Sequence, residues 1–291
     1  MATLSSSDAK LFHKLLNSLL FYANNKLNII KNCTSKEEFL KIDIEKTVPL
    51  RQKIFSENSI IDSFIKENPE QLNKEELNII SSWKSSKEAE CFLFKHLNDS
   101  TLFYNLRDGK VYGVVGITDS FEEKFNGSVS IMLKIRLLSF KGRITYEGIF
   151  SAYKISFGRN MLSSFNSDAQ VAIHKYGIIA SFDSPVIEKT NSDEETLRFY
   201  CKTQDNRDRY FEEIKNLKKK TPLLEAIYFQ EEGKVASREL KKNLKELGVE
   251  GHFVVLNRCV VASAKSKREL DTQILTMVPE SKRDWIYIFT I

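Results

Sequence analysis

The spacing of the apolar residues changes near Thr101, and this change constrains the fold more than any other feature of the chain. Between Asp8 and Lys26, two rows of apolar residues step by four, as one buried face of a helix requires. After Thr101 the apolar residues alternate, and Asp108-Gly109 stands where a tight turn would join two strands. Separate blocks of helical and strand sequence are typical of the α+β class. We therefore predict an α+β protein.

The first part, residues 1–100, is predicted to be helical. After the helix that follows Asp8, Ser35 and Glu38 stand three apart, which is the spacing of a capping box at a helix start. Apolar residues at helical spacing then predict helices over 49–68 and 73–98. Asn68-Pro69 separates these two helices, because the residue before a proline is driven out of the helical conformation.

The second part, residues 101–182, is predicted to be a small antiparallel β-unit followed by a helix. Strand patterns recur at 129–140, 143–150 and 153–157, and Lys141-Gly142 supplies a tight turn. About five strands with such short connections form a small sheet, and an SH3-like barrel is one such arrangement. A helix over about 160–176 and a last short strand near 178–182 complete this part.

Residues 183–221 are predicted to be an acidic linker that passes into one charged helix. The linker carries the polar run SPVIEKTNSDEE, and the helix would end in the lysine run 218–220. Thr221-Pro222 then stops that helix and opens the last part of the chain.

Residues 222–291 are predicted to form a winged-helix-like α+β module. Glu231-Glu232-Gly233 would close a first helix, and Ser237 would cap a second helix that ends at Gly248. A β-hairpin over 253–261 with its tip at Asn257-Arg258 follows, then a helix that begins at Ser266 and a strand over 285–291 that pairs with the hairpin. Two short helices followed by a hairpin are the order found in winged helices.

This module offers the clearest candidate for a binding site. In a winged helix the second helix enters the major groove and the hairpin approaches phosphate or the minor groove. Lysine and arginine there neutralise phosphates and release counterions. Only Arg238 and Asn243 are suited to reading base edges, so sequence specificity is expected to be low. The alternative is an ordinary exposed, charged helix face. The candidate nucleic-acid-binding residues are Arg238, Lys241, Lys242, Lys245 and Arg258.

The β-unit carries a second basic set, and we single out Lys141 and Arg143 at its tight turn as candidate nucleic-acid-binding residues. Cations beside aromatic rings can hold single-stranded nucleic acid by charge and stacking. The alternative is that the rings form the core of the unit and the charges its solvated face. The basic residues are Lys134, Arg136, Lys141, Arg143, Lys154 and Arg159, and the aromatic residues are Phe140, Tyr146, Tyr153 and Phe157.

The sequence offers no catalytic, metal or cofactor site of recognised spacing. The 4 histidines and 4 cysteines are far apart and form no metal-binding pair. The chain contains no phosphate-binding loop and no nucleophile elbow. We therefore predict no catalytic residue, no metal and no cofactor. A nuclease would need several carboxylates and a lysine around a metal, and the nearest approach to such a set is Asp119, Glu122, Glu123 and Lys134.

The net charge of +5 is modest, and its positive excess lies in the middle and at the end of the chain. This permits a polyanionic partner without requiring one. The chain begins without the features of a secretory signal, and no run of about 18 apolar residues occurs, so we predict no membrane span and a cytoplasmic location.

Three segments of the middle region also resemble an uncharacterised family of bacterial proteins. These are VYGVVGITDSFEE at 111–123, LLSFKGRITYEGIF at 137–150 and YKISFG at 153–158. The resemblance covers mainly residues 83–182, and the proteins it involves often have an all-helical front end. It implies a bacterial source and no particular activity.

Together these patterns favour a non-enzymatic binding protein, associated with DNA or RNA and with little sequence specificity. A protein–protein adaptor that docks through the helical region 1–100 is the alternative hypothesis. An enzyme with an unrecognised, nuclease-like metal site is a further alternative.

Overall fold

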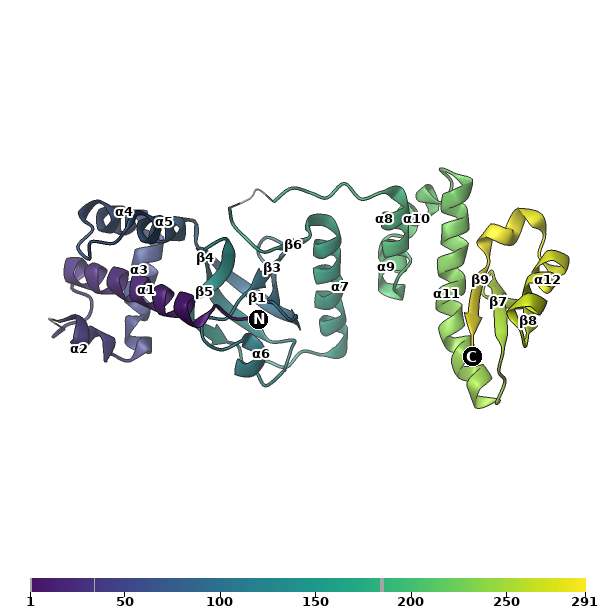
Figure 1. Ribbon diagram of the computed structural model, residues 1–291, viewed down its shortest axis with the longest axis horizontal. Coiled ribbons are helices and arrows are strands. Elements are labelled where there is room, and N and C mark those ends of the chain that lie inside the picture. The colour runs from purple at the N-terminus through teal and green to yellow at the C-terminus, as the bar shows by residue number, and fades with distance from the viewer. Residues whose placement is uncertain (1, 34, 184–185) are drawn as a thin grey trace. The chain divides into compact units, whose positions relative to one another are not determined.

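The chain folds into two compact units, Met1–Lys189 and Thr190–Ile291. The computed structural model describes residues 2–33, 35–183 and 186–291 (Figure 1). Within each unit, stretches of helices and stretches of strands follow one another along the chain. The predicted α+β class is therefore confirmed.

The N-terminal unit begins with helices that lie on one side of its barrel (Figure 1). Ser5 caps α1 by accepting a hydrogen bond from the Asp8 N–H, and the predicted capping box of Ser35 and Glu38 is present at α2. The elements are α1 (Ser6–Leu27), α2 (Lys36–Leu40), η1 (Ile44–Thr47), α3 (Val48–Ser56), α4 (Asn58–Glu67), α5 (Lys74–Ser82) and η2 (Trp83–Ser85).

Five strands of this unit form a small closed barrel, which agrees with the prediction for the β-unit. The predicted strand over 153–157 is wrong, because these residues form no strand, and β1 supplies the fifth strand instead. They are hydrogen-bonded in the order β2-β1-β4-β5-β3, and pairing between β2 and β3 closes the ring. Most neighbours are antiparallel, whereas β3 runs parallel to β5. The remaining elements are α6, α7 and a short strand β6 that pairs in parallel with β3. The bounds are β1 (Lys87–His96), β2 (Thr101–Asn105), β3 (Lys110–Val114), α6 (Phe121–Lys124), β4 (Met132–Phe140), β5 (Arg143–Ala152), α7 (Arg159–Tyr176) and β6 (Ile178–Ile179).

Two of the predicted N-terminal helices are wrong in their extent. The helix predicted over 73–98 ends at Ser82, and the second half of that range is the strand β1. The strand β1 pairs with β2 on one edge and β4 on the other, and its apolar residues are buried on the faces of the sheet. This long-range pairing overrides the local helical pattern. The helix predicted over 49–68 is two helices, because Glu57 is extended between α3 and α4.

One hydrophobic core joins the helices to the barrel. Phe12 of α1 lies edge-on to Trp83 and to Phe140 of β4, with ring centroids 5.6 and 5.5 Å apart. The indole N–H of Trp83 donates to the Ser139 carbonyl at 2.9 Å. The predicted helical region and β-unit therefore pack as one body, with the apolar faces of the helices turned onto the barrel.

The C-terminal unit contains four helices, then a three-stranded sheet that also carries α12 and η3. The sheet order is β8-β7-β9. Where one charged helix was predicted after the linker, the structure has three short ones, α8, α9 and α10. The bounds are α8 (Asp193–Tyr200), α9 (Gln204–Arg209), α10 (Phe211–Leu217), α11 (Pro222–Glu246), β7 (His252–Leu256), β8 (Cys259–Ala264), α12 (Lys267–Met277), η3 (Glu280–Trp285) and β9 (Tyr287–Thr290).

The two short helices predicted within 222–248 are wrong, because α11 is one continuous helix of 25 residues. Gly233 does not end a helix. It lets α11 approach the sheet, since a β-carbon there would lie 2.7 Å from Cβ of Tyr287. Ser237, predicted as a helix cap, is buried inside α11, where its hydroxyl donates to the Lys234 carbonyl.

The predicted hairpin and final strand are confirmed. β7 and β8 pair across Asn257 and Arg258, both of which have positive φ angles of 49° and 67°. Such a turn matches the right-handed twist of the two strands. β9 pairs with β7 on its other edge. A helix followed by a hairpin agrees with the winged-helix-like prediction, whereas the helix-turn-helix part of that prediction does not occur in 222–248.

Candidate nucleic-acid interface

The cations predicted on the second helix lie on the last three turns of α11. Arg238, Lys242 and Lys245 are exposed, and they share one line of the helix because they are spaced four and three residues apart. Lys241 instead leans over the sheet, with its ammonium 5.4 Å from the centroid of Phe289. Leu247, which was expected to face inward, is 76% exposed.

Arg258 at the hairpin tip turns toward α11. Its guanidinium lies 3.6 Å from Oε2 of Glu232, a carboxylate that also pairs with Arg207. The prediction that the helix face and the hairpin tip form a joint phosphate-binding surface is therefore not supported at Arg258, because a carboxylate already partly neutralises its charge.

The two cations at the barrel turn also have partners within the protein. Lys141 is bound to Asp8 of α1, with Nζ 2.5 Å from Oδ1, and this contact lowers the pKa of the Asp8 carboxyl. Arg143 donates from Nη2 to the Asp99 carbonyl at 2.8 Å. Both cations are therefore engaged within the protein, so a nucleic-acid ligand would have to compete with these contacts.

The rest of the barrel set is divided between paired and exposed residues. Lys134 and Arg136 both pair with Glu88, at 3.0 and 3.5 Å. Lys154 and Arg159 are exposed beyond the end of β5. Among the aromatic residues, Phe140 and Tyr146 are buried in the barrel core, as the alternative interpretation expected.

The carboxylates of the nuclease-like hypothesis serve a helix end instead of a metal site. Glu123 and Ser120 form a capping box at α6, and Asp119 pairs with Lys124 at 2.8 Å. Lys134 lies on a different element, β4, where it pairs with Glu88. Within the described residues, no three histidine, cysteine, aspartate or glutamate side chains are grouped as a metal ion would require.

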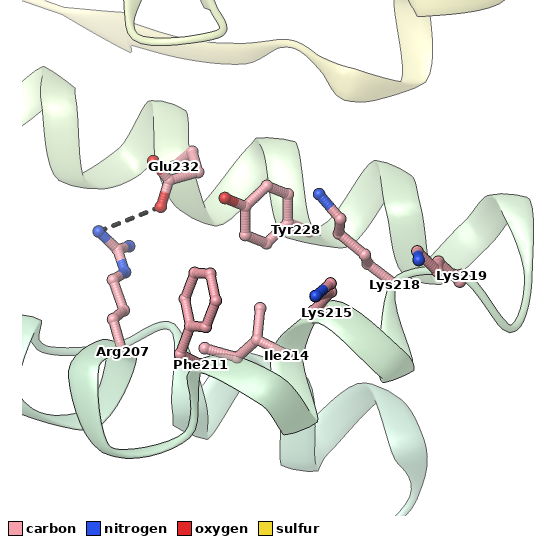
Figure 2. Close-up of a pocket in the computed structure, with 8 residues that line it drawn as sticks. All are labelled: Arg207, Phe211, Ile214, Lys215, Lys218, Lys219, Tyr228 and Glu232. Carbon is pink, nitrogen blue, oxygen red and sulfur yellow. Dashed lines mark ion pairs between the residues drawn. The ribbon is translucent and has the colours of Figure 1, made fainter.

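A slot between α10 and α11 brings together cations and aromatic rings that the sequence did not single out (Figure 2). It has a volume of about 320 Å³. Phe211 and Ile214 line it from α10, and Tyr228 faces them from α11 (Figure 2). Phe211 is unusually exposed to solvent for a phenylalanine, with 64% of the residue accessible. The slot therefore offers aromatic surface to a ligand.

The two ends of this slot differ in charge. Lys215, Lys218 and Lys219 gather at one end, and the ammonium of Lys218 lies 4.6 Å from the centroid of the Tyr228 ring (Figure 2). At the other end, Nη1 of Arg207 lies 3.2 Å from Oε1 of Glu232. With four cations and one carboxylate, the lining is strongly positive, and it suits an anion that also carries a flat, apolar group.

The Arg207–Glu232 end of the slot is buried. The two side chains are only 10% and 12% exposed. Nε of Arg207 has no hydrogen-bond acceptor in the described structure, although it is a buried donor. Burial also raises the pKa of the Tyr228 hydroxyl, so the ring stays neutral and presents an uncharged face. The lysine run 218–220 was the sequence signal for this slot, and it was assigned only to the end of a charged helix.

Comparison with known proteins does not identify a relative. No family model matches the chain, and neither the curated proteins nor the solved structures contain a match. Within the described residues, no helix is long and apolar enough to cross a membrane. The function is therefore argued from the geometry of the slot.

Proposed function

We propose that this protein is a nucleic-acid-binding protein with little sequence specificity, and that the slot between α10 and α11 receives a base of a single strand. One observation carries the proposal. The aromatic rings of Phe211 and Tyr228 share a slot with Lys215, Lys218 and Lys219. Proteins that hold single strands without reading their sequence combine these two features, rings for the bases and cations for the backbone.

The size of the slot supports a single base rather than a longer segment. Its volume of about 320 Å³ lies at the lower end of the range for small-molecule sites. Stacking of a base on an aromatic ring contributes about 1–3 kcal/mol and tolerates every base, since all bases have a π-face. The unpaired Nε–H of Arg207 would find an acceptor on any base edge. Binding without selection follows from both contacts.

The exposed line on α11 provides a path for the strand beyond the slot. Arg238, Lys242 and Lys245 lie about 15–25 Å from Tyr228 along the helix axis, at 1.5 Å per residue. Phosphates of neighbouring nucleotides could bind there. The residues predicted from the sequence on this helix would then take part as backbone contacts, which position a nucleic acid without reading it.

The test is a titration of the full chain with fluorescently labelled single-stranded oligonucleotides, followed by fluorescence anisotropy at low salt. We expect binding of both oligo-dT and oligo-rU. The variant F211A removes the exposed ring and is expected to weaken binding by about tenfold, which corresponds to 1.4 kcal/mol of lost stacking. The triple variant K215Q/K218Q/K219Q is expected to weaken it further.

A matched control removes three cations elsewhere in the same unit. Lys265, Lys267 and Arg268 are exposed at the start of α12 and do not line the slot. K265Q/K267Q/R268Q therefore changes the net charge equally and is expected to keep most of the affinity. Equal loss in both triple variants, or no binding by the unaltered protein at low salt, would refute the proposal. A protein partner that survives nuclease treatment would favour the adaptor hypothesis instead.

A further inference from the structure

The N-terminal unit contains a larger cleft between its helices and its barrel. The cleft has a volume of about 800 Å³, and η1, α3, β1, β4 and β5 line it. A smaller cavity of about 200 Å³ lies on the other side of Arg51 and Glu147, and both residues line both spaces. The first volume falls within the range of small-molecule sites.

Buried arginine and glutamate side chains form the floor of this cleft. Arg51 and Glu147 are only 5% and 8% exposed. Arg51 donates from Nε to the Thr47 hydroxyl at 2.8 Å and from Nη1 to the Glu147 carbonyl at 2.5 Å. Arg136 approaches the same glutamate from β4. The two hydrogen bonds fix the Arg51 guanidinium beside the Glu147 carboxylate.

The two arginines surround the Glu147 carboxylate without hydrogen-bonding to it. Nη1 of Arg51 is 3.9 Å from Oε2, and Nε of Arg136 is 3.7 Å from Oε1. Both distances exceed that of a hydrogen bond. As a result, Oε2 of Glu147 and Nε of Arg136 are buried atoms without a hydrogen-bond partner in the described structure. Leaving such groups unsatisfied costs about 1–3 kcal/mol each.

A break in the strand pairing places Glu147 at this position. Ile135 pairs with Phe150 and Leu137 with Tyr146, so Glu147, Gly148 and Ile149 stand opposite Arg136 alone. Gly148 has a φ angle of 90°, which an L-residue with a side chain rarely adopts. Bulges of this kind redirect side chains and are common beside functional sites. The backbone is thus built to bring Glu147 and Arg136 together.

We infer that this cleft binds a nucleobase-sized, planar ligand whose edge carries an N–H donor next to an acceptor. The N–H would donate to Oε2 of Glu147, and the acceptor would receive the Nε–H of Arg136. Such a ligand satisfies both buried groups at once, whereas a purely anionic or purely cationic one satisfies only one of them. The apolar walls, which include Ile135 and Phe150, suit a flat ring. This site is separate from the slot of the C-terminal unit and does not depend on it.

Two nucleosides and their methylated forms test the inference on the full chain by isothermal titration calorimetry. The pairs are inosine with 1-methylinosine and adenosine with N6,N6-dimethyladenosine, and in both pairs methylation removes every N–H donor of the base. We expect at least one nucleoside to bind, and its methylated form to bind at least tenfold more weakly, because the carboxylate is then left unsatisfied.

The variant E147Q keeps the size of the side chain and removes its charge. We expect it to weaken the nucleoside by about tenfold, since a hydrogen bond to a charged acceptor becomes one to a neutral acceptor. E122Q, at an exposed glutamate of α6, is the matched control and is expected to bind as the unaltered protein does. Thermal unfolding establishes that both variants are folded. The inference is overturned if neither nucleoside binds below about 1 mM, or if the methylated forms bind as tightly as their parents.

Discussion

Nη1 of Arg207 lies 3.2 Å from Oε1 of Glu232, and the opposite oxygen of this carboxylate lies 3.6 Å from Nη1 of Arg258. One buried glutamate thus connects α9, α11 and the hairpin tip. Removing one partner from a buried pair leaves the other charge uncompensated, at a cost of about 3–5 kcal/mol. We predict that E232Q lowers the free energy of unfolding by about 3 kcal/mol, as measured by urea denaturation.

The comparison for this prediction is E246Q. Glu246 lies at the end of the same helix and is exposed, so its neutralisation is expected to change the free energy of unfolding by no more than about 0.5 kcal/mol. Similar values for E232Q and E246Q would show that the Glu232 carboxylate does not hold the unit together.

Gly233 is predicted to resist replacement by alanine, although alanine is the better helix former by about 1 kcal/mol. A β-carbon at this position would lie 2.7 Å from Cβ of Tyr287, which cannot rotate away. We expect G233A to destabilise the protein by about 1–3 kcal/mol through overpacking, as measured by thermal and urea unfolding.

The alanine substitution N243A provides the reference for G233A. Asn243 is exposed on α11, so only helix propensity changes there, and a neutral or slightly stabilising effect is expected. A stabilising effect of G233A would mean that α11 does not need this close approach to the sheet.

Gly233 also shows why the continuity of α11 was not predictable. A glycine after two glutamates is a reasonable helix end when only neighbouring residues are considered. Its actual role depends on Tyr287, which lies far along the chain and becomes a neighbour only when β9 joins the sheet. The tertiary contact with Tyr287 therefore determines the role of Gly233 in α11, and this contact could not be predicted from the local sequence.

The local sequence predicted an element correctly where neighbouring residues alone determine its conformation. Asn257 and Arg258 both have positive φ angles at the hairpin tip, and asparagine tolerates that conformation well, so the turn could be placed from the sequence. The candidate site was harder to predict from the sequence. The predicted cations on α11 are largely exposed, but the slot combines residues of α9, α10 and α11 that meet only in the folded unit. The cleft lined by Arg51 and Glu147 likewise depends on a bulge in β5, and no residue pattern in the sequence predicted that bulge.

Salt dependence is predicted to report on the slot lysines. Each phosphate neutralised on a single strand contributes about −0.7 to the slope of log K against log salt concentration. If Lys215, Lys218 and Lys219 each contact a phosphate, K215Q/K218Q/K219Q should flatten the slope by about 2. The measurement is the affinity for a labelled single strand between about 50 and 200 mM salt. An unchanged slope would mean that these lysines do not contact the backbone.

Glu147 is predicted to make the stability of the protein depend on pH. Burial raises the pKa of its carboxyl from the ordinary 4.5 to about 6, against the opposing influence of Arg51 and Arg136. Because the folded state holds this proton more tightly than the unfolded state, the group stabilises the fold fully below pH 4.5. That contribution is lost as the pH rises through about 6.

A shift of this size corresponds to about 2 kcal/mol, at 1.36 kcal/mol for each pH unit. We expect the difference in unfolding free energy between the unaltered protein and E147Q to change by about 2 kcal/mol between pH 4.5 and pH 7, with the unaltered protein losing stability relative to the variant. The other titratable groups that line the cleft and the cavity beside Glu147 are present in both proteins, so their own titration largely cancels in the difference. They are Arg51, Arg136, Glu88, Lys134, Glu45 and His13. A difference that does not depend on pH would show that the Glu147 carboxyl titrates alike in the folded and unfolded states.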